Sequence, residues 1–135
     1  MISILLPDET IVDIPLVDVR WMETLDKMVE DLGTKIQIPL ENVDLKTLQK
    51  IAVWIKHQTS KDLKPENLNP KDIDGKFEPD PWTADWLNMN MPLLLKVYKA
   101  SDYLEIPYLI DLISWAIAKK INGKTPEQTL EILEF

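Results

Sequence analysis

Few side chains in this sequence have the types and spacing that enzymatic chemistry requires. His57 is the single histidine among 135 residues, and cysteine is absent. A histidine metal cluster, a thiolate zinc site and a thiol nucleophile are therefore excluded. His57 also has no visible partners for a catalytic triad. Carboxylate pairs are numerous, but 23 acidic residues produce such pairs by chance. The sequence argues against catalysis by this chain, and we expect no cofactor.

One short motif imitates a nucleotide-binding site. Gly123-Lys124-Thr125 has the residue types that end a phosphate-binding loop. That motif needs a second glycine where this chain has Ala118. The residues also follow an expected helix and not a strand, so their amide groups would not converge on a phosphate. We interpret the match as a coincidence.

An excess of acidic residues restricts the class of partner. The formal net charge is −8, and residues 1–42 hold nine Asp or Glu against Arg20, Lys27 and Lys35. Such a surface disfavours nucleic acids and anionic membranes, because both are polyanions, and it suits a basic protein. Met1 leads straight into an alternating segment and no apolar run approaches a membrane span. We therefore expect no signal peptide and a cytoplasmic and/or nuclear protein.

The hydrophobic pattern of the first forty residues predicts a small three-stranded sheet. Ile2, Ile4 and Leu6 alternate as in a half-buried strand, and residues 7–10 have turn composition. Residues 11–14 then complete a hairpin, and Ile36 and Ile38 before Pro39 predict a third strand.

Helical spacing dominates the rest of the chain. Apolar residues from Met22 to Leu32 recur at helical intervals, and Gly33 is a suitable C-terminal stop. Asp44 and Asn90 have the side chains of helix N-caps. The further helices that we expect span residues 45–57, 83–87, 91–104, 107–122 and a last one from Pro126, capped by Thr125.

Residues 59–81 contain four prolines and many polar residues. This composition predicts a loop without helices, and its length predicts that it is flexible or depends on a partner for its order.

The helix expected after Pro107 has more apolar surface than one small core needs. Its main stripe is widened by further apolar residues; the two sets are Ile106, Leu109, Ile110, Ile113, Ile117 and Ile121, and Leu112, Trp115 and Ala116. A helix that is apolar on two sides is either central in a large core or bound to a partner. An amphipathic partner helix would supply the cover. Trp115 has two equally weighted interpretations, an anchor at that interface or a residue packed under the loop.

The segment from Ala100 to Pro126 resembles the S-phase kinase-associated protein family, the adaptors that join F-box proteins to a cullin. Matching residues continue through most of the chain; they include Pro39, Asn42, Val43, Trp54, Ala100, Tyr103, Leu104, Ile106, Leu109, Asp111, Ala118, Ile121 and the run from Gly123 to Pro126. The resemblance implies an α+β fold of the BTB/POZ type, a small three-stranded sheet flanked by helices. It implies a domain over residues 1–122 with a loop at about 59–81, and an F-box-binding helical extension that begins at residues 123–135. The sequence ends at Phe135, so we expect it to lack the family's last C-terminal helices.

The same resemblance implies two partner surfaces. Asp102 and Tyr103 would contact the cullin, although asparagine is usual where this chain has Asp102. The F-box would contact Leu109, Ser114, Ile117, Ile121, Thr129 and Leu133. Trp115 stands at a position that is usually polar in the family.

Other hypotheses stay open at this point. Tyr103 and Leu104 have the pattern of residues that close the core at a helix end. An Elongin C-like adaptor shares the expected fold but recognises a different receptor helix. A self-associating structural protein would use the same apolar helix for a homodimer. An adaptor without its F-box leaves that helix free, so homodimerisation is compatible with both functions.

Overall fold

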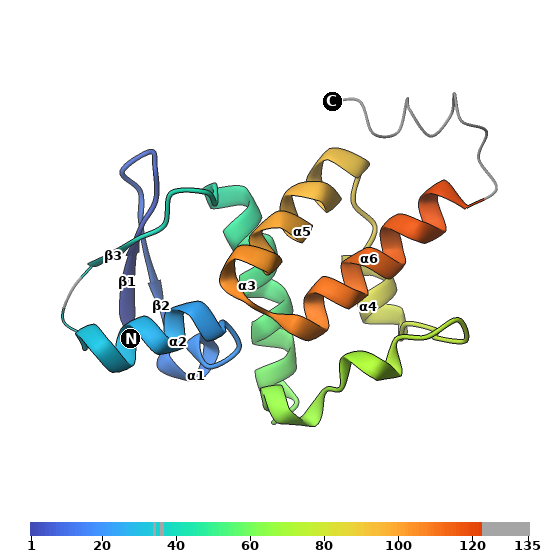
Figure 1. Ribbon diagram of the computed structural model, residues 1–135, viewed down its shortest axis with the longest axis horizontal. Coiled ribbons are helices and arrows are strands. Elements are labelled where there is room, and N and C mark those ends of the chain that lie inside the picture. Colours follow the sequence, from blue (N-terminus) through green and yellow to red (C-terminus); the bar gives the residue numbers. More distant parts are fainter. Residues whose placement is uncertain (34, 36, 123–135) are drawn as a thin grey trace.

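The computed structural model covers residues 1–135 and describes residues 1–33, 35 and 37–122 (Figure 1). The capped helix expected from Pro126, with Thr129 and Leu133, lies outside the described residues. The described part combines a three-stranded sheet at one end with a set of packed helices at the other (Figure 1). It contains no helix long and apolar enough to cross a membrane.

The sheet confirms the strand prediction. It consists of β1 (Ile2–Leu5), β2 (Ile11–Ile14) and β3 (Gln37–Pro39) in the order β2-β1-β3. β1 pairs antiparallel with β2 through a tight turn, and parallel with β3. Ile4 lies opposite Val12 on one side and Ile38 on the other. Because side chains alternate along a strand, the buried side chains of Ile2, Ile4, Ile14 and Ile38 form one inner face.

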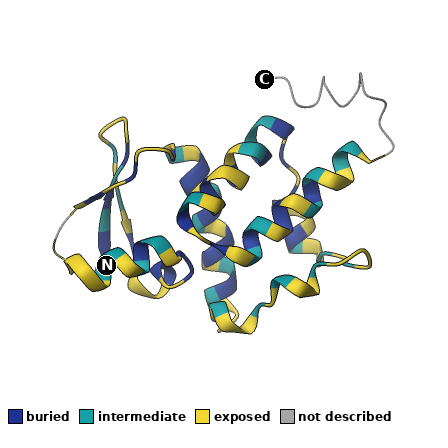
Figure 2. Ribbon diagram, viewed as in Figure 1, coloured by how far each residue is buried: buried dark blue, intermediate teal, exposed yellow. Residues whose placement is uncertain are grey.

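The helices follow the expected order with local differences. They are α1 (Leu16–Val19), α2 (Glu23–Leu32), α3 (Leu45–Ser60), α4 (Pro81–Trp86), α5 (Met91–Leu104) and α6 (Pro107–Ile121). α1 was not expected from the sequence, since four residues show no periodicity. Gly33 ends α2 with φ 81°, a backbone conformation that favours glycine. Most helices bury one side and expose the other (Figure 2).

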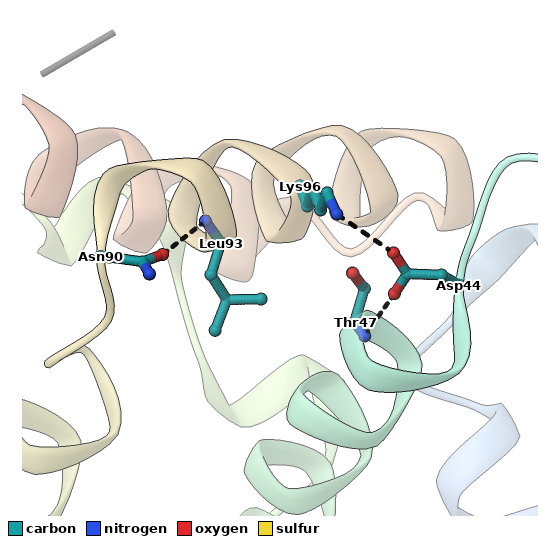
Figure 3. A network of polar contacts seen from close by, with 5 residues as sticks. All are labelled: Asp44, Thr47, Asn90, Leu93 and Lys96. Carbon is teal, nitrogen blue, oxygen red and sulfur yellow. Dashed lines mark hydrogen bonds and ion pairs between the residues drawn. The ribbon is translucent and has the colours of Figure 1, made fainter. Parts of the chain in front are cut away.

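The two predicted N-caps form. The Asp44 carboxylate accepts a hydrogen bond from the Thr47 amide at 2.8 Å, and the Asn90 side chain accepts one from the Leu93 amide at 3.0 Å (Figure 3). The second oxygen of Asp44 lies 3.5 Å from Nζ of Lys96 on α5. Asp44 therefore caps the start of α3 and links it to α5.

The prediction of a loop without helices at residues 59–81 was wrong in two respects. α3 continues to Ser60, and two short 3-10 helices, η1 (Pro65–Asn67) and η2 (Pro70–Asp72), begin at prolines. Proline has no amide hydrogen, but the amide hydrogens of the first helical turn have no partner within the helix. Proline is therefore tolerated at the start of a helix and not in its interior. The apolar side chains of the segment, those of Leu63, Leu68, Ile73 and Phe77, pack against the core.

We expect Asp44→Ala to lower the free energy of unfolding by about 1 kcal/mol, the usual value of an N-cap. Hydrogen bonds from Thr47, with a smaller contribution from Lys96, hold the pKa of Asp44 below its usual 3.8. A lowered pKa in the folded state stabilises the protein above pH 3.8, and this contribution is lost as the pH falls through the folded-state pKa. Urea denaturation at several pH values measures the free energy of unfolding of wild type and variant. The difference between the two free energies should become smaller in acid. Glu41→Ala, a change at an exposed carboxylate nearby, is the control, and an equal loss there would contradict the capping role.

Candidate functional site

α6 divides into a core side and an outer side. Leu109, Leu112, Ile113 and Ala116 are buried. A second set lies beside it, roughly a third of a turn around the helix, and is exposed or partly exposed; it comprises Ile110, Ser114, Ile117, Ala118 and Ile121. Of these, Ile117 and Ile121 also pack against the edge of the core. We call the second set the outer band of α6. The Ser114 hydroxyl donates to the Ile110 carbonyl at 2.8 Å, so it needs no hydrogen bond from a partner.

The outer band includes three of the six residues that the sequence assigned to F-box binding, namely Ser114, Ile117 and Ile121. Ile110 and Ala118 were not among those six residues, but each stands four residues from Ser114 and therefore shares this face of α6. Together these residues make a narrow surface with small polar and branched apolar side chains. Such a surface suits a partner helix that buries its own apolar face.

Leu109 lies elsewhere. It is 0% exposed and belongs to the hydrophobic core. A side chain with no exposed surface packs its own helix and has no area to offer a partner. The structure therefore corrects the placement of Leu109 on the partner surface, because one stripe of a helix cannot face both the core and a partner.

Trp115 packs under the segment that follows α3. The ring of Phe77 meets the Trp115 ring edge to face, with 5.1 Å between centroids, and Nζ of Lys119 lies 5.6 Å from the indole. The indole Nε1 is buried and has no hydrogen-bond partner within the described residues. Of the two interpretations of Trp115, the contact with Phe77 favours packing under the loop.

The second candidate surface lies at the end of α5. Asp102 is exposed and Tyr103 is partly buried. Leu104 is fully buried and closes the core, as one of the sequence hypotheses held. The Tyr103 carbonyl accepts a hydrogen bond from Oγ1 of Thr24 at 3.0 Å, which fixes this helix end against the start of α2. The sequence prediction for Asp102 and Tyr103 is thus compatible with their exposure, while Leu104 has a structural role.

The connection between the two candidate surfaces is short and is held by backbone hydrogen bonds. α5 ends at Leu104, and α6 begins at Pro107. Glu105 takes the left-handed conformation, with φ 58°, and its carbonyl accepts a hydrogen bond from the Glu23 amide at 3.2 Å. The Ile106 side chain is buried, and its amide donates to the Ser101 carbonyl at 2.9 Å. These bonds hold the end of α5 and the start of α6 in one arrangement.

His57 has a packing role in the described part of the chain. Its ring is stacked on the Trp82 indole, with centroids 3.6 Å apart and planes at 2°. Burial lowers the pKa of His57, Lys61 lowers it further, and Asp80 opposes both effects. The imidazole is therefore neutral at pH 7. Within residues 1–33 and 37–122, no three histidine or acidic side chains come together as a metal site would need.

The sequence is similar to known proteins over most of its length. Residues 2–60 match the family described as Skp1 family, tetramerisation domain. The chain is 30% identical over 113 residues to SCF ubiquitin ligase complex protein SKP1b of Dictyostelium discoideum, covering 83% of this chain and 69% of that protein. It is 30% identical over 108 residues to E3 ubiquitin ligase complex SCF subunit sconC of Arthroderma otae, covering 77% and 64%. It is 34% identical over 110 residues to SKP1-like protein 1A of Arabidopsis thaliana, covering 78% and 66%. The chain thus spans about two thirds of the length of these relatives.

We expect Leu109→Ala to reduce stability by about 2–5 kcal/mol, because it opens a cavity in the core. Ile117→Ala is a change on the same helix at a partly exposed position, and it should lower the free energy of unfolding by less. Thermal or urea unfolding of the two variants measures the difference. Equal losses would show that the core side and the outer band of α6 are not distinct.

Proposed function

This chain belongs to the Skp1 family, and on that premise we propose that it is a non-catalytic adaptor joining an F-box protein to a cullin in an SCF-type ubiquitin ligase. Relatives named as SCF ubiquitin ligase complex proteins support the proposal. The observation that carries it is the outer band of α6, a partly apolar surface on a helix whose other side is already buried in the core.

The outer band is the proposed F-box surface. Ile117 and Ile121 supply branched apolar contacts, while Ser114 and Ala118 are small enough to let a partner backbone approach. Thr129 and Leu133 belong to the same proposed surface by resemblance to the family. An F-box helix that buries apolar residues along this band would remove them from water, which is the main source of affinity in such contacts.

The end of α5 is the proposed cullin surface. Tyr103 combines an apolar ring with a hydroxyl, a combination that is frequent at binding hot spots. Asp102 beside it is exposed and the chain carries a formal charge of −8, so a basic patch on the cullin would be attracted during encounter. Charge would then set the rate and orientation of binding, and burial of the Tyr103 ring would set its strength.

The adaptor would act through fixed geometry. The hydrogen bonds of Ile106 and Glu105 hold the end of α5 and the start of α6 together. Two partners bound at these helices would therefore keep one relative position. Holding a substrate receptor at a set place relative to the ligase raises the effective concentration of the substrate at the reacting groups.

We expect Ile117→Asp to weaken F-box binding about tenfold or more while cullin binding persists, because a carboxylate would be buried without a partner. Tyr103→Ala should weaken cullin binding while F-box binding persists. Co-purification with a cullin and an F-box protein, followed by titration calorimetry, measures both. Val53→Asp places the same charge on an exposed residue of α3 and is the control. If the wild-type chain bound neither partner, the proposal would be wrong. If it preferred an Elongin C-type receptor peptide over an F-box peptide in competition, an Elongin C-like adaptor would be favoured.

Self-association through the outer band is the second candidate, favoured by the partial exposure of Ile110, Ile117 and Ile121. We expect the mass from light scattering to fall to that of a monomer when an F-box peptide is added, since both would use one surface. Ile117→Asp should also yield a monomer without any peptide. A dimer that persists through both changes would favour a structural protein over an adaptor.

A further inference from the structure

β2 is an edge strand of the sheet. The strand order is β2-β1-β3, so one side of β2 pairs with β1 and no strand of the described chain lies on its other side. Among the described elements, β2 has extensive contact only with β1. An open edge exposes backbone amides and carbonyls that a further strand can bind. The edge lies on a different part of the chain from the outer band of α6 and the end of α5 (Figure 1).

The pairing register determines which backbone groups of β2 are free. The Leu6 amide donates to the Thr10 carbonyl at 2.9 Å, so these two residues form a hydrogen-bonded pair of the antiparallel ladder. Because such pairs alternate along a strand, Val12 also directs its backbone groups towards β1, whereas Ile11 and Asp13 direct theirs outwards. Neither of these two backbones forms a hydrogen bond with another segment of the described chain. The outer edge of β2 therefore presents the amides and carbonyls of both residues without partners.

The edge formed by β3 is less suited to a further strand. β3 has three residues, Gln37–Pro39. The Leu40 amide donates to the Leu5 carbonyl at 2.9 Å, so the backbone of the preceding Pro39 faces outwards. Proline has no amide hydrogen to donate, and this weakens pairing at an edge. We therefore concentrate on β2.

Charge selects the partner of the β2 edge. Asp13 is exposed, and its carboxylate accepts a hydrogen bond from the Ser3 hydroxyl at 2.7 Å. Asp8 and Glu9 are exposed in the turn at one end of β2, and the chain has no Lys or Arg before Arg20. Within the described residues, none of these three carboxylates forms an ion pair. They attract a basic strand, whereas a second copy of β2 would place carboxylates against carboxylates.

We propose that the outer edge of β2 binds a basic, extended segment of a partner protein as an additional antiparallel strand. The backbone of the segment pairs with Ile11 and Asp13. Because side chains alternate along a strand, its basic residues lie on the outer face beside Asp13, and their alkyl stems cover Ile11, which is 52% exposed. Its branched apolar residues lie on the other face, beside the partly buried Val12. The site goes beyond the proposed adaptor function and does not depend on it.

The test uses the full chain and a capped peptide of about six residues, a common strand length, in which lysine and valine alternate. Hydrogen exchange followed by NMR should show fast exchange of the Ile11 and Asp13 amides in the free chain. Exchange should slow about tenfold or more when the peptide binds. The Val12 amide is paired with β1 in both states and is the internal control. Slow exchange at Ile11 and Asp13 in the free chain would assign the edge to another segment or a second copy and would contradict the proposal.

Two methylated peptides separate backbone pairing from charge. In the proposed register the lysine amides point to β2, and the valine amides point away from it. N-methylation of the lysines should therefore weaken binding about tenfold or more, whereas N-methylation of the valines should leave the affinity unchanged. Both peptides carry the same charge. Equal affinities, or weaker binding of the valine-methylated peptide, would overturn the proposal.

The role of charge is tested with protein variants and a further peptide. Asp13→Asn should weaken binding of the lysine peptide about threefold, because one cross-strand pair of opposite charges is lost. Asp85→Asn makes the same change at an exposed position of α4 and should leave the affinity unchanged. A peptide with glutamate in place of lysine should not bind. Equal affinities of the two variants, or equal binding of the lysine and glutamate peptides, would rule out a basic partner.

Discussion

The indole of Trp54 joins the parts of this fold. It is 1% exposed and lies in the middle of α3. Trp21, which precedes α2, meets it edge to face at 5.5 Å, Trp86 of α4 lies at 6.4 Å, and Tyr108 of α6 stacks on it at 6.0 Å. One side chain thus contacts segments from the start, the middle and the end of the described chain. Truncating a buried tryptophan costs about 3–5 kcal/mol, so the packing of α3 against these segments depends on this side chain.

The candidate partner surface follows from a limit on α6. A helix has room for one buried side, and Leu109, Leu112, Ile113 and Ala116 occupy it. Ile110, Ile117 and Ile121 lie beside this buried side and stay partly exposed, although Ile117 and Ile121 also pack against the edge of the core. A partner bound along this part of α6 would remove that surface from water.

In the segment between α3 and α4, contacts with the core determine structure that the amino-acid composition does not predict. Its prolines break long helices, but Pro65 and Pro70 stand where short turns begin, and a fixed φ assists that start. Its apolar residues are spaced too irregularly to show a period, yet Leu68 and Phe77 reach the core. Phe77 then covers Trp115, which lies 38 positions further along the chain, so the segment has a defined place on the helices.

Local patterns determined much of this protein. The strands from alternation, the caps at Asp44 and Asn90, and the wide apolar surface of α6 were all predicted, because each depends on residues a few positions apart. The family resemblance assigned Ser114, Ile117 and Ile121 to a partner surface, and this assignment stays a prediction. Only the tertiary structure decided that Leu109 faces the core and that Phe77 covers Trp115. Those outcomes depend on contacts between segments that are distant in sequence. Helical spacing determines which residues share a face of a helix, but it does not determine which face packs against the core.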